Sequence, residues 1–365
     1  MVARMSTRFA DAIGHEQHGG QVFRAARELG CDWRDILDFS ANINPLGLPD
    51  SARRALTDSL DAVVHYPESG APGVQAAAAK AWGLPTAGIL VGNGATELIH
   101  SLIRTLTPCR AHLVVPTFSE YRCALDECTV STTTWDHRAG NETNLDHIVS
   151  DAAEQDADLL ILTNPNNPTG HVISNETLAA NLIGRLPAAI RILVDESFID
   201  FTHQPSLAEL RKLHGLFILR SFTKFYAMPG LRIGCLVGEP GDIADLAASR
   251  APWQTNILAE KATEAALADT DYQARSLALV EKERAWLSQR LADLPGIEPL
   301  PSAANFIFCR CVTPVDQIAK QLLLVRILIR DCTATEGIEG GAFRVGVRTR
   351  AENERLIASM EKILG

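Results

Sequence analysis

The stretch LFILRSFTKFYAMPGLRIG, residues 216–234, places a strand-like apolar run directly before a lysine. Lys224 is one of only seven lysines in the chain, and it lies between Thr223 and Phe225, with Arg232 eight positions later. A lysine on the surface needs no such neighbours. Apolar surroundings disfavour the ammonium form, and a lysine that loses its proton is a nucleophile. We interpret Lys224 as a reactive lysine, with a structural lysine as the alternative.

Apolar runs like LFIL recur between residues 85 and 240 and are too short for most helices. They are GILVGN, AHLVVP, DLLILTNP, IRILVDES, LFILRSF and RIGCLVG. Nearly all-apolar runs are typical of strands covered on both faces. GATELIHSLIRTL, between two of them, has the apolar period of a helix. Strands alternating with helices predict an α/β fold with a mainly parallel sheet.

Polar clusters follow four of the predicted strands. GNGATE follows the first, NPNNPTG another, Asp195 closes a third, and Ser221 to Lys224 follow a fourth. Each has a simpler interpretation, as a turn, a helix cap or the start of a helix. Ligands of open parallel sheets bind beyond the carboxyl ends of the strands. A reactive lysine, an acid, an asparagine loop and a phosphate cradle at one edge therefore indicate a cofactor with an aldehyde, a phosphate and a ring nitrogen.

The C-terminal third has a different pattern. Residues 242–268 and 272–294 predict long amphipathic helices, and NFIFCRC, RILIRDC and FRVGVRT predict strands of a second sheet. We therefore expect a large cofactor-binding domain at 46–255 and a smaller α+β domain at 256–365. Residues 1–45 are expected to join the small domain and a dimer interface.

Composition limits the function classes. The chain has 365 residues, 46% of them hydrophobic and 21% charged, with a net charge of −10. The negative charge argues against nucleic acid as a partner, and no apolar run is long enough to cross a membrane. Scattered cysteines without paired C-x-x-C motifs favour reduced thiols over disulfides or a metal site. We expect a cytoplasmic enzyme without a metal.

The order of GNGATE, PTFSEY, NPNNPTG, DESF, SFTK and PGLRIG resembles that of the fold type I, aspartate aminotransferase-like enzymes, whose cofactor is pyridoxal 5'-phosphate. The resemblance covers nearly the whole chain. It is most specific for the branch that holds histidinol-phosphate aminotransferase and the threonine-phosphate decarboxylase of cobalamin (vitamin B12) biosynthesis.

This resemblance implies roles for individual residues. Lys224 would form the Schiff base, Asn167 would hydrogen-bond the phenolic oxygen, and Phe118 would stack on the pyridine ring. The cofactor phosphate would be held by the amides of Ala95 and Thr96 and the side chains of Ser221, Thr223 and Arg232. Tyr66 in HYPESG would reach the phosphate of a neighbouring subunit, which implies a homodimer with shared active sites.

The resemblance pairs Asp195 with the pyridinium nitrogen. Opposite charges about 3 Å apart at an effective dielectric near 20 interact by roughly 5 kcal/mol, or about four pKa units. The ring would therefore stay protonated and remain an electron sink. The sequence departs from its relatives at Phe198, where aminotransferases commonly have a tyrosine that donates a second hydrogen bond to the phenolic oxygen. This departure counts against a conventional aminotransferase.

The substrate residues implied are Arg344 for the carboxylate and Arg330 as a second cation, because guanidinium suits carboxylate and phosphate. Residue chemistry leaves decarboxylation and amino transfer open. QHGGQ at 17–21, LDFSANINPLG at 37–47 and KFYAMPGLR resemble the threonine-phosphate decarboxylases. The implied reaction converts L-threonine O-3-phosphate to (R)-1-amino-2-propanol O-2-phosphate, with His18 and Asn42 near the substrate phosphate. For His18, a buried structural role is the alternative.

Two other functions are compatible with parts of this pattern. A histidinol-phosphate or related aminotransferase is the enzymatic alternative. Some transcription regulators carry this fold as a sensor domain behind a DNA-binding domain. The segment before residue 46 is short and not strongly basic, which argues against a regulator.

Overall fold

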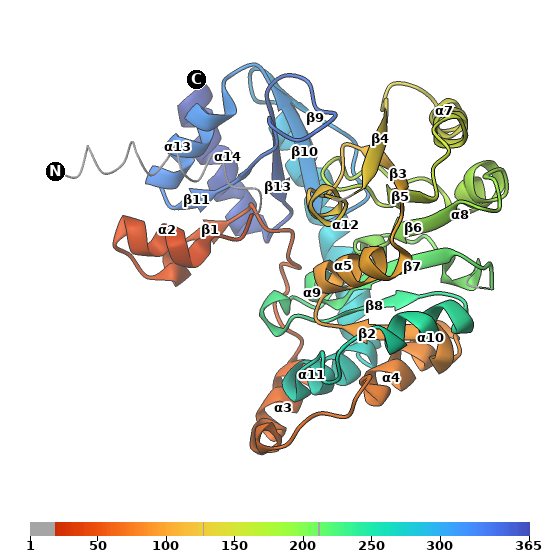
Figure 1. Cartoon of the computed structure of the whole chain (residues 1–365). Helices are drawn as coiled ribbons and strands as arrows, with labels where there is room; N and C mark the ends of the chain where they lie inside the picture. Colours follow the sequence, from red (N-terminus) through yellow and green to blue (C-terminus); the bar gives the residue numbers. More distant parts are fainter. Residues whose placement is uncertain (1–18, 127, 211) are drawn as a thin grey trace. The chain divides into compact units, whose positions relative to one another are not determined.

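The computed structural model describes residues 19–126, 128–210 and 212–365, and these form two compact units (Figure 1). The larger unit contains residues 46–167 and 171–276. The smaller unit contains the described residues up to 45, with 168–170 and 277–365. Residues 256–276 go with the larger unit in this division, whereas the sequence assigned them to the smaller domain.

The larger unit is built on a seven-stranded sheet of order β2-β8-β7-β6-β5-β3-β4 (Figure 1). The strands are β2 (Ile89–Gly92), β3 (Arg110–Val115), β4 (Thr129–Thr134), β5 (Leu159–Thr163), β6 (Arg191–Asp195), β7 (Leu216–Ser221) and β8 (Gly234–Val237). Both pairs that β8 makes are antiparallel and the other four pairs are parallel. Only β8 therefore runs against its neighbours, and the predicted α/β fold with a mainly parallel sheet is confirmed.

Burial explains why the central runs are strands. Every residue of β5 and β7 is buried, as expected for strands covered on both faces. The helices of this unit are α3 (Asp50–Asp58), α4 (Pro72–Trp82), α5 (Ala95–Leu106), α6 (Glu120–Ala124), α7 (Asn141–Glu154), α8 (Asn175–Leu178), α9 (Phe222–Phe225), α10 (Pro240–Ala248) and α11 (Ile257–Leu267). The apolar side of α5 packs Leu98 and Leu102 into one core cluster with Leu113 and Ile161 of the sheet. The helical period predicted for α5 thus selects the face that covers the sheet.

One helix prediction was wrong. The sequence predicted a single long helix over 242–268, but the structure has α10 ending at Ala248 and α11 beginning at Ile257. Pro252 in the intervening segment has no backbone N–H to continue a helix. Asn256 then starts α11 as its N-cap, accepting a hydrogen bond from the Ala259 amide.

The smaller unit is α+β, as predicted. Its four-stranded antiparallel sheet has the order β12-β13-β10-β9, and a second, two-stranded parallel sheet pairs β1 with β11. The strands are β1 (Leu37–Asp38), β9 (Ile297–Pro299), β10 (Phe306–Cys311), β11 (Ile327–Leu328), β12 (Arg330–Asp331) and β13 (Ala342–Gly346). The helices are α2 (Val22–Leu29), α13 (Val315–Leu324) and α14 (Arg350–Leu364). Helix α12 (Thr270–Ala292) begins in the larger unit and ends in the smaller one.

Among the described residues, no helix combines the length and the apolar character that crossing a bilayer requires.

Candidate active site

The sequence motifs begin at one edge of the large sheet. Gly92, Val115, Thr163, Asp195 and Ser221 are the last residues of β2, β3, β5, β6 and β7. These five strands are mutually parallel, so their carboxyl ends lie at the same edge. The polar clusters that follow the strands therefore converge as expected from the sequence, at the edge where open α/β sheets bind ligands.

The first turn of α5 forms an anion cradle with an arginine. The amides of Ala95 and Thr96 begin the helix, where backbone N–H groups have no intrahelical acceptor. Gly94 precedes them with φ +86°, and a Cβ on this glycine would fall 2.6 Å from Arg232 Nη2. The absence of a side chain at Gly94 thus lets the guanidinium lie against the helix start. A helix N-terminus beside a guanidinium is a phosphate-binding arrangement.

Lys224 lies just beyond β7, on the short helix α9. Its Nζ donates to Ser221 Oγ at 2.9 Å, and this hydroxyl is 2.8 Å from Thr223 Oγ1. The ring centre of buried Phe198 lies 5.9 Å from the same Nζ. The hydroxyl neighbours of the lysine are thus those beside it in the sequence, whereas its aromatic neighbour Phe198 comes from a different loop.

Asp195 ends β6 with both carboxylate oxygens engaged. Its Oδ2 accepts from Tyr121 OH at 2.7 Å, and its Oδ1 accepts from the Ser197 amide at 2.8 Å. Burial and the charge of Asp195 raise the pKa of Tyr121 well above its usual value, so the phenol stays a neutral donor. Two fixed donors set the orientation of this carboxylate.

Tyr121 was missed as a functional residue by the sequence reasoning. It stands three positions after Phe118 in PTFSEY, and the two rings make an edge contact with centres 6.3 Å apart. The available signal was a phenol in a motif that follows a buried strand. Its partner, Asp195, is 74 positions away in the sequence, so the contact requires the fold.

Two further predicted cofactor residues lie in the loops at this edge. Phe118 follows β3 and is half-buried against the core cluster of the larger unit. Asn167 follows β5 and is also half-buried. The loop before Asn167 is anchored by Asn164, which exchanges two hydrogen bonds of 2.9 Å with the backbone of Ile173. These two hydrogen bonds hold the backbone of the loop that carries the Asn167 side chain.

Tyr66 is exposed. Its side chain is 80% accessible, and its ring stacks on Trp253 with centres 4.8 Å apart. Leu60, Val63 and Val64 nearby in the sequence are also large, apolar and exposed. Exposed apolar groups gathered in one segment are typical of an interface with a partner.

The smaller unit places two arginines directly opposite each other. Arg330 on β12 is the register partner of Arg344 on β13. Burial, with Arg330 beside it, lowers the pKa of Arg344 to about 10, and burial also lowers the pKa of Arg330. Like charges opposed across a strand pair destabilise a sheet unless an anion offsets them. The pair is therefore suited to carboxylate or phosphate.

Asn42 and the glycine pair lie in the same unit as these arginines. Asn42 Oδ1 is buried and has no hydrogen bond among the described residues. The Gly20 amide donates to Ser40 Oγ at 2.8 Å, and a Cβ on Gly19 would fall 2.2 Å from the Ser40 carbonyl oxygen. That carbonyl accepts from Arg344 Nη2 at 3.0 Å. The glycines thus let the N-terminal segment lie against the backbone that Arg344 contacts. His18 lies outside the described residues.

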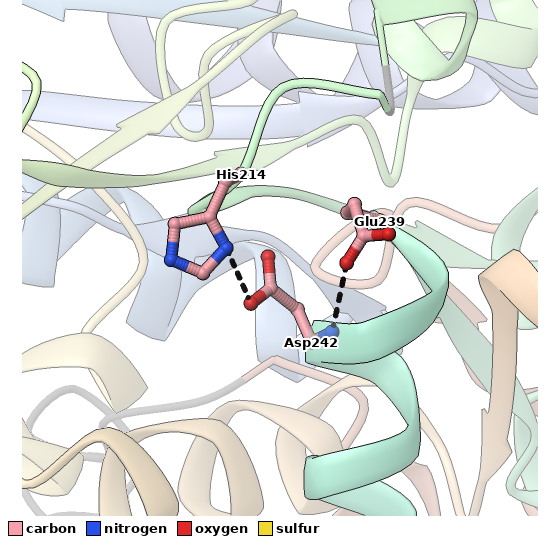
Figure 2. Close-up of side chains that lie close together, drawn as sticks. All are labelled: His214, Glu239 and Asp242. Atoms are coloured by element: carbon pink, nitrogen blue, oxygen red, sulfur yellow. Dashed lines mark hydrogen bonds and ion pairs between the residues drawn. The ribbon is translucent and has the colours of Figure 1, made fainter.

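A separate group of potential metal ligands, His214, Glu239 and Asp242, stands before β7 and at the start of α10 (Figure 2). Glu239 caps α10 by accepting from the amides of Gly241 and Asp242 at 2.7 and 3.2 Å. Asp242 accepts from the Gly215 amide at 2.9 Å and pairs with His214 Nδ1 at 2.9 Å. The carboxylates hold a helix start and a turn, and we assign them a structural role.

Comparison with known proteins decides the family. Residues 34–360 match the family model for aminotransferase class I and II. The chain belongs to this family. It is 37% identical to the threonine-phosphate decarboxylase of Salmonella typhimurium over 97% of this chain and 98% of that protein. It is 30% identical to histidinol-phosphate aminotransferase 2 of Ralstonia nicotianae, over 100% and 98%. The structure of the L-threonine-O-3-phosphate decarboxylase from Porphyromonas gingivalis matches with TM-score 0.79 and 25% identity, covering 90% of this chain and 99% of that one.

The chain is accordingly a pyridoxal 5'-phosphate-dependent enzyme, and the side chains at the sheet edge fit this cofactor. The α5 start with Arg232 suits its phosphate, the amine of Lys224 its aldehyde, and the carboxylate of Asp195 its ring nitrogen. The phosphate, the aldehyde and the ring nitrogen of the cofactor thus each have a group of complementary chemistry within the larger unit.

Proposed function

We propose that this enzyme decarboxylates L-threonine O-3-phosphate to (R)-1-amino-2-propanol O-2-phosphate, the aminopropanol arm of cobalamin. The observation that carries the proposal is the 37% identity with a threonine-phosphate decarboxylase along nearly the full length of both chains. The same likeness extends to a putative decarboxylase of this kind from Caldanaerobacter subterraneus, at 32% identity. The glycine pair at Gly19 and Gly20, packed on Ser40, supports it further.

The cofactor would be held by the larger unit. Lys224 would bind its aldehyde carbon, and Asp195 would pair with its ring nitrogen. The residues proposed for its phosphate are Ala95, Thr96, Ser221, Thr223 and Arg232, together with Tyr66 of a second subunit. Phe118 would cover the ring, and Asn167 would donate to the phenolic oxygen. Buried Phe198 has no hydroxyl to add a second donor there.

The substrate carries two anionic groups, and Arg344 and Arg330 supply two guanidiniums. We assign the carboxylate to Arg344 and propose that Arg330, Asn42 and His18 contribute to phosphate binding. A bound dianion would offset the repulsion between the opposed arginines.

Orientation of the carboxylate decides the reaction. Pyridoxal phosphate, when bound, draws electrons from whichever bond at the substrate Cα stands perpendicular to its ring. Arg344 would bind and orient the carboxylate, so that carbon dioxide would leave and the bonding electron pair would stay at Cα. Lys224 Nζ would then deliver a proton to Cα from one face. In the overall reaction, the substrate and one proton give carbon dioxide and the amino alcohol phosphate.

The substrate phosphate creates a competing reaction, because an electron pair at Cα can expel a leaving group at Cβ. The cations around the phosphate would oppose this by holding the phosphate and fixing the orientation of the Cβ–O bond. We therefore expect carbon dioxide release with little free phosphate.

Amino transfer from histidinol phosphate is the second candidate, since relatives that are histidinol-phosphate aminotransferases share 29–32% identity with this chain. A product assay separates the two. Purified holoenzyme is offered threonine phosphate, serine phosphate, or histidinol phosphate with 2-oxoglutarate, and carbon dioxide, amino alcohol phosphate, glutamate and free phosphate are measured. The proposal would be overturned if glutamate formed from histidinol phosphate and 2-oxoglutarate while threonine phosphate released no carbon dioxide.

We also propose a homodimer with shared active sites, located in the cytoplasm. The exposed Tyr66 and its apolar neighbours support a partner surface. All eight cysteines are free thiols, which is in keeping with a reducing compartment.

A further inference from the structure

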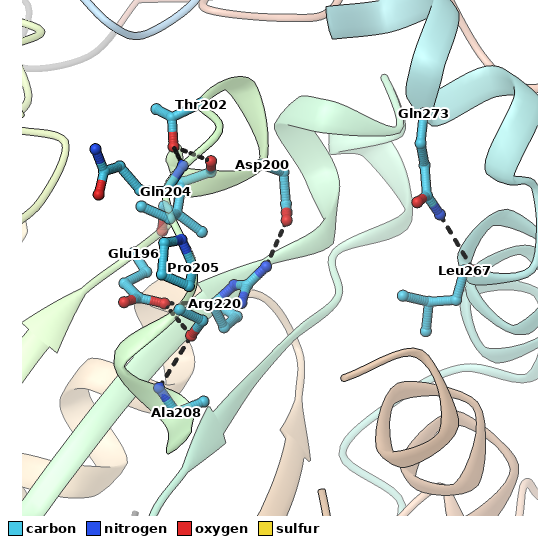
Figure 3. A network of polar contacts seen from close by, with 12 residues as sticks. Glu196, Asp200, Thr202, Gln204, Pro205, Ala208, Arg220, Leu267 and Gln273 are labelled. Atoms are coloured by element: carbon cyan, nitrogen blue, oxygen red, sulfur yellow. Dashed lines mark hydrogen bonds and ion pairs between the residues drawn. The ribbon is translucent and has the colours of Figure 1, made fainter. Parts of the chain in front are cut away.

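Arg220 is a buried cation directly before Ser221, and neither the sequence motifs nor the proposed mechanism uses it. Its side chain is 3% exposed on β7 and pairs with Glu196, which is fully buried, and with Asp200 (Figure 3). Side chains alternate across a strand, so Arg220 and Ser221 point to opposite faces of the sheet. The cation thus lies on the face opposite Ser221.

The two acids that Arg220 binds flank the residues around Lys224. Glu196 follows Asp195 directly, and Asp200 comes two positions after Phe198. Arg220 Nη1 lies 3.7 Å from Glu196 Oε2, and Arg220 Nη2 donates to Asp200 Oδ1. Because Arg220 binds residues 196 and 200, it restrains the segment between them. That segment contains the Ser197 amide, which binds Asp195, and the Phe198 ring, which faces Lys224.

Glu196 extends the restraint further along the chain. Its Oε1 accepts from the Leu207 amide at 2.7 Å, and its Oε2 accepts from Ser206 Oγ. Ser206 Oγ in turn accepts from the Ala208 amide at 3.1 Å (Figure 3). The loop after β6 therefore folds back on a carboxylate whose counter-charge is Arg220.

Arg220 is also linked, through Trp82, to the segment that carries the lysine. Its guanidinium carbon lies 4.5 Å from the ring centre of Trp82, and Trp82 stacks on Phe222 with centres 5.8 Å apart and an interplanar angle of 15°. Phe222 opens α9, two positions before Lys224. One cation thus joins the loop of Asp195 to the helix of Lys224.

We infer that Arg220 is a positioning residue that fixes Asp195 and Phe198 relative to Lys224 from the opposite face of the sheet. The inference rests on the proposed roles of Asp195 and Lys224, but not on which substrate the enzyme uses. Without Arg220, the loop loses its counter-charge and Asp195 pairs less firmly with the ring nitrogen. A bound cofactor would then withdraw electrons less strongly, and its visible absorbance would titrate at a higher pH.

The test compares Arg220→Met with Arg350→Met, a control that has the same kinds of partner but is 39% exposed. Arg350 also pairs with a buried glutamate, Glu283, at 2.9 Å and lies 4.4 Å from a tryptophan ring centre, Trp286, but it stands in the smaller unit. Each purified holoprotein is titrated with pH while the visible absorbance of the cofactor is followed, and its thermal unfolding is recorded. We expect both variants to lose thermal stability, but only Arg220→Met to raise the titration midpoint, by about one unit.

Asp200→Asn provides a milder variant should Arg220→Met fail to fold, because the Asp200 side chain is 27% exposed and only one contact of Arg220 is lost. It should shift the midpoint in the same direction by less. A wild-type midpoint in both Arg220→Met and Asp200→Asn would overturn the inference. Borohydride reduction with peptide mapping is run on the wild type first. A label on a lysine other than Lys224 would refute the site assignment and the inference with it, whereas the product assay alone addresses the substrate.

Discussion

Replacing Asp195 with asparagine tests the electrostatic centre of the proposed site. The carboxylate accepts from Tyr121 OH at 2.7 Å and from the Ser197 amide at 2.8 Å, and it is 8% exposed. Asparagine has nearly the same shape, and its carbonyl oxygen accepts from one donor while its NH₂ group donates to the phenol oxygen. The fold should therefore survive, and the change removes mainly the negative charge.

The magnitude follows from Coulomb's law. A carboxylate about 3 Å from a ring nitrogen cation, at an effective dielectric near 20, contributes roughly 5 kcal/mol. If half of this energy is expressed in the transition state, the barrier rises by about 2.5 to 3 kcal/mol and kcat falls about a hundredfold. The cofactor should stay partly bound, because the proposed phosphate site at the α5 start and Arg232 is untouched.

The assay measures kcat for carbon dioxide release from threonine phosphate and the cofactor content of purified Asp195→Asn. The matched control is Asp158→Asn. Asp158 precedes β5 and accepts from the amides of Cys109 and Arg110 at 2.8 and 3.2 Å. It lies at the amino end of a parallel strand, away from the motifs, so its kcat should equal that of the wild type. A near-wild-type rate in fully loaded Asp195→Asn would refute the role of this charge.

Three further outcomes are expected. Arg344→Lys keeps the charge but loses the guanidinium fork, so KM for threonine phosphate should rise about tenfold. The control Arg326→Lys, at a half-exposed pair with Asp35, should leave KM unchanged. Equal KM values for the two variants would contradict the carboxylate role of Arg344. Burial lowers the pKa of His112, partly offset by Asp151, so the unfolded chain binds a proton that the folded chain does not. The free energy of unfolding should therefore fall by up to about 1.4 kcal/mol per pH unit as pH drops below 6.5. Urea titrations at several pH values measure this free energy, and in His112→Gln it should depend less steeply on pH. If active sites are shared, subunit exchange between Tyr66→Ala and Lys224→Ala should restore activity, since one site of the hybrid has both native residues; no recovery would argue against sharing.

Much of the fold could be predicted because its signals are local. The buried strands of the large sheet read as continuous apolar runs, and α5 reads as a helical period. β4 was missed, since TVSTTT is polar and lies at the sheet edge beside β3 alone. An edge strand with exposed positions has no apolar run to reveal it. The break between α10 and α11 was also missed, because an amphipathic pattern continues across Pro252.

The sequence by itself determined which residues stand at the carboxyl ends of the strands, because apolar runs and the polar motifs behind them are neighbours along the chain. Only the tertiary structure decided which of these residues meet. Tyr121 binds Asp195 across 74 positions, Arg220 pairs with Glu196 and Asp200 of the loop after β6, and Arg330 opposes Arg344 through strand register. Such pairings depend on how strands align and pack, and no local pattern encodes the distance between groups so far apart in the sequence.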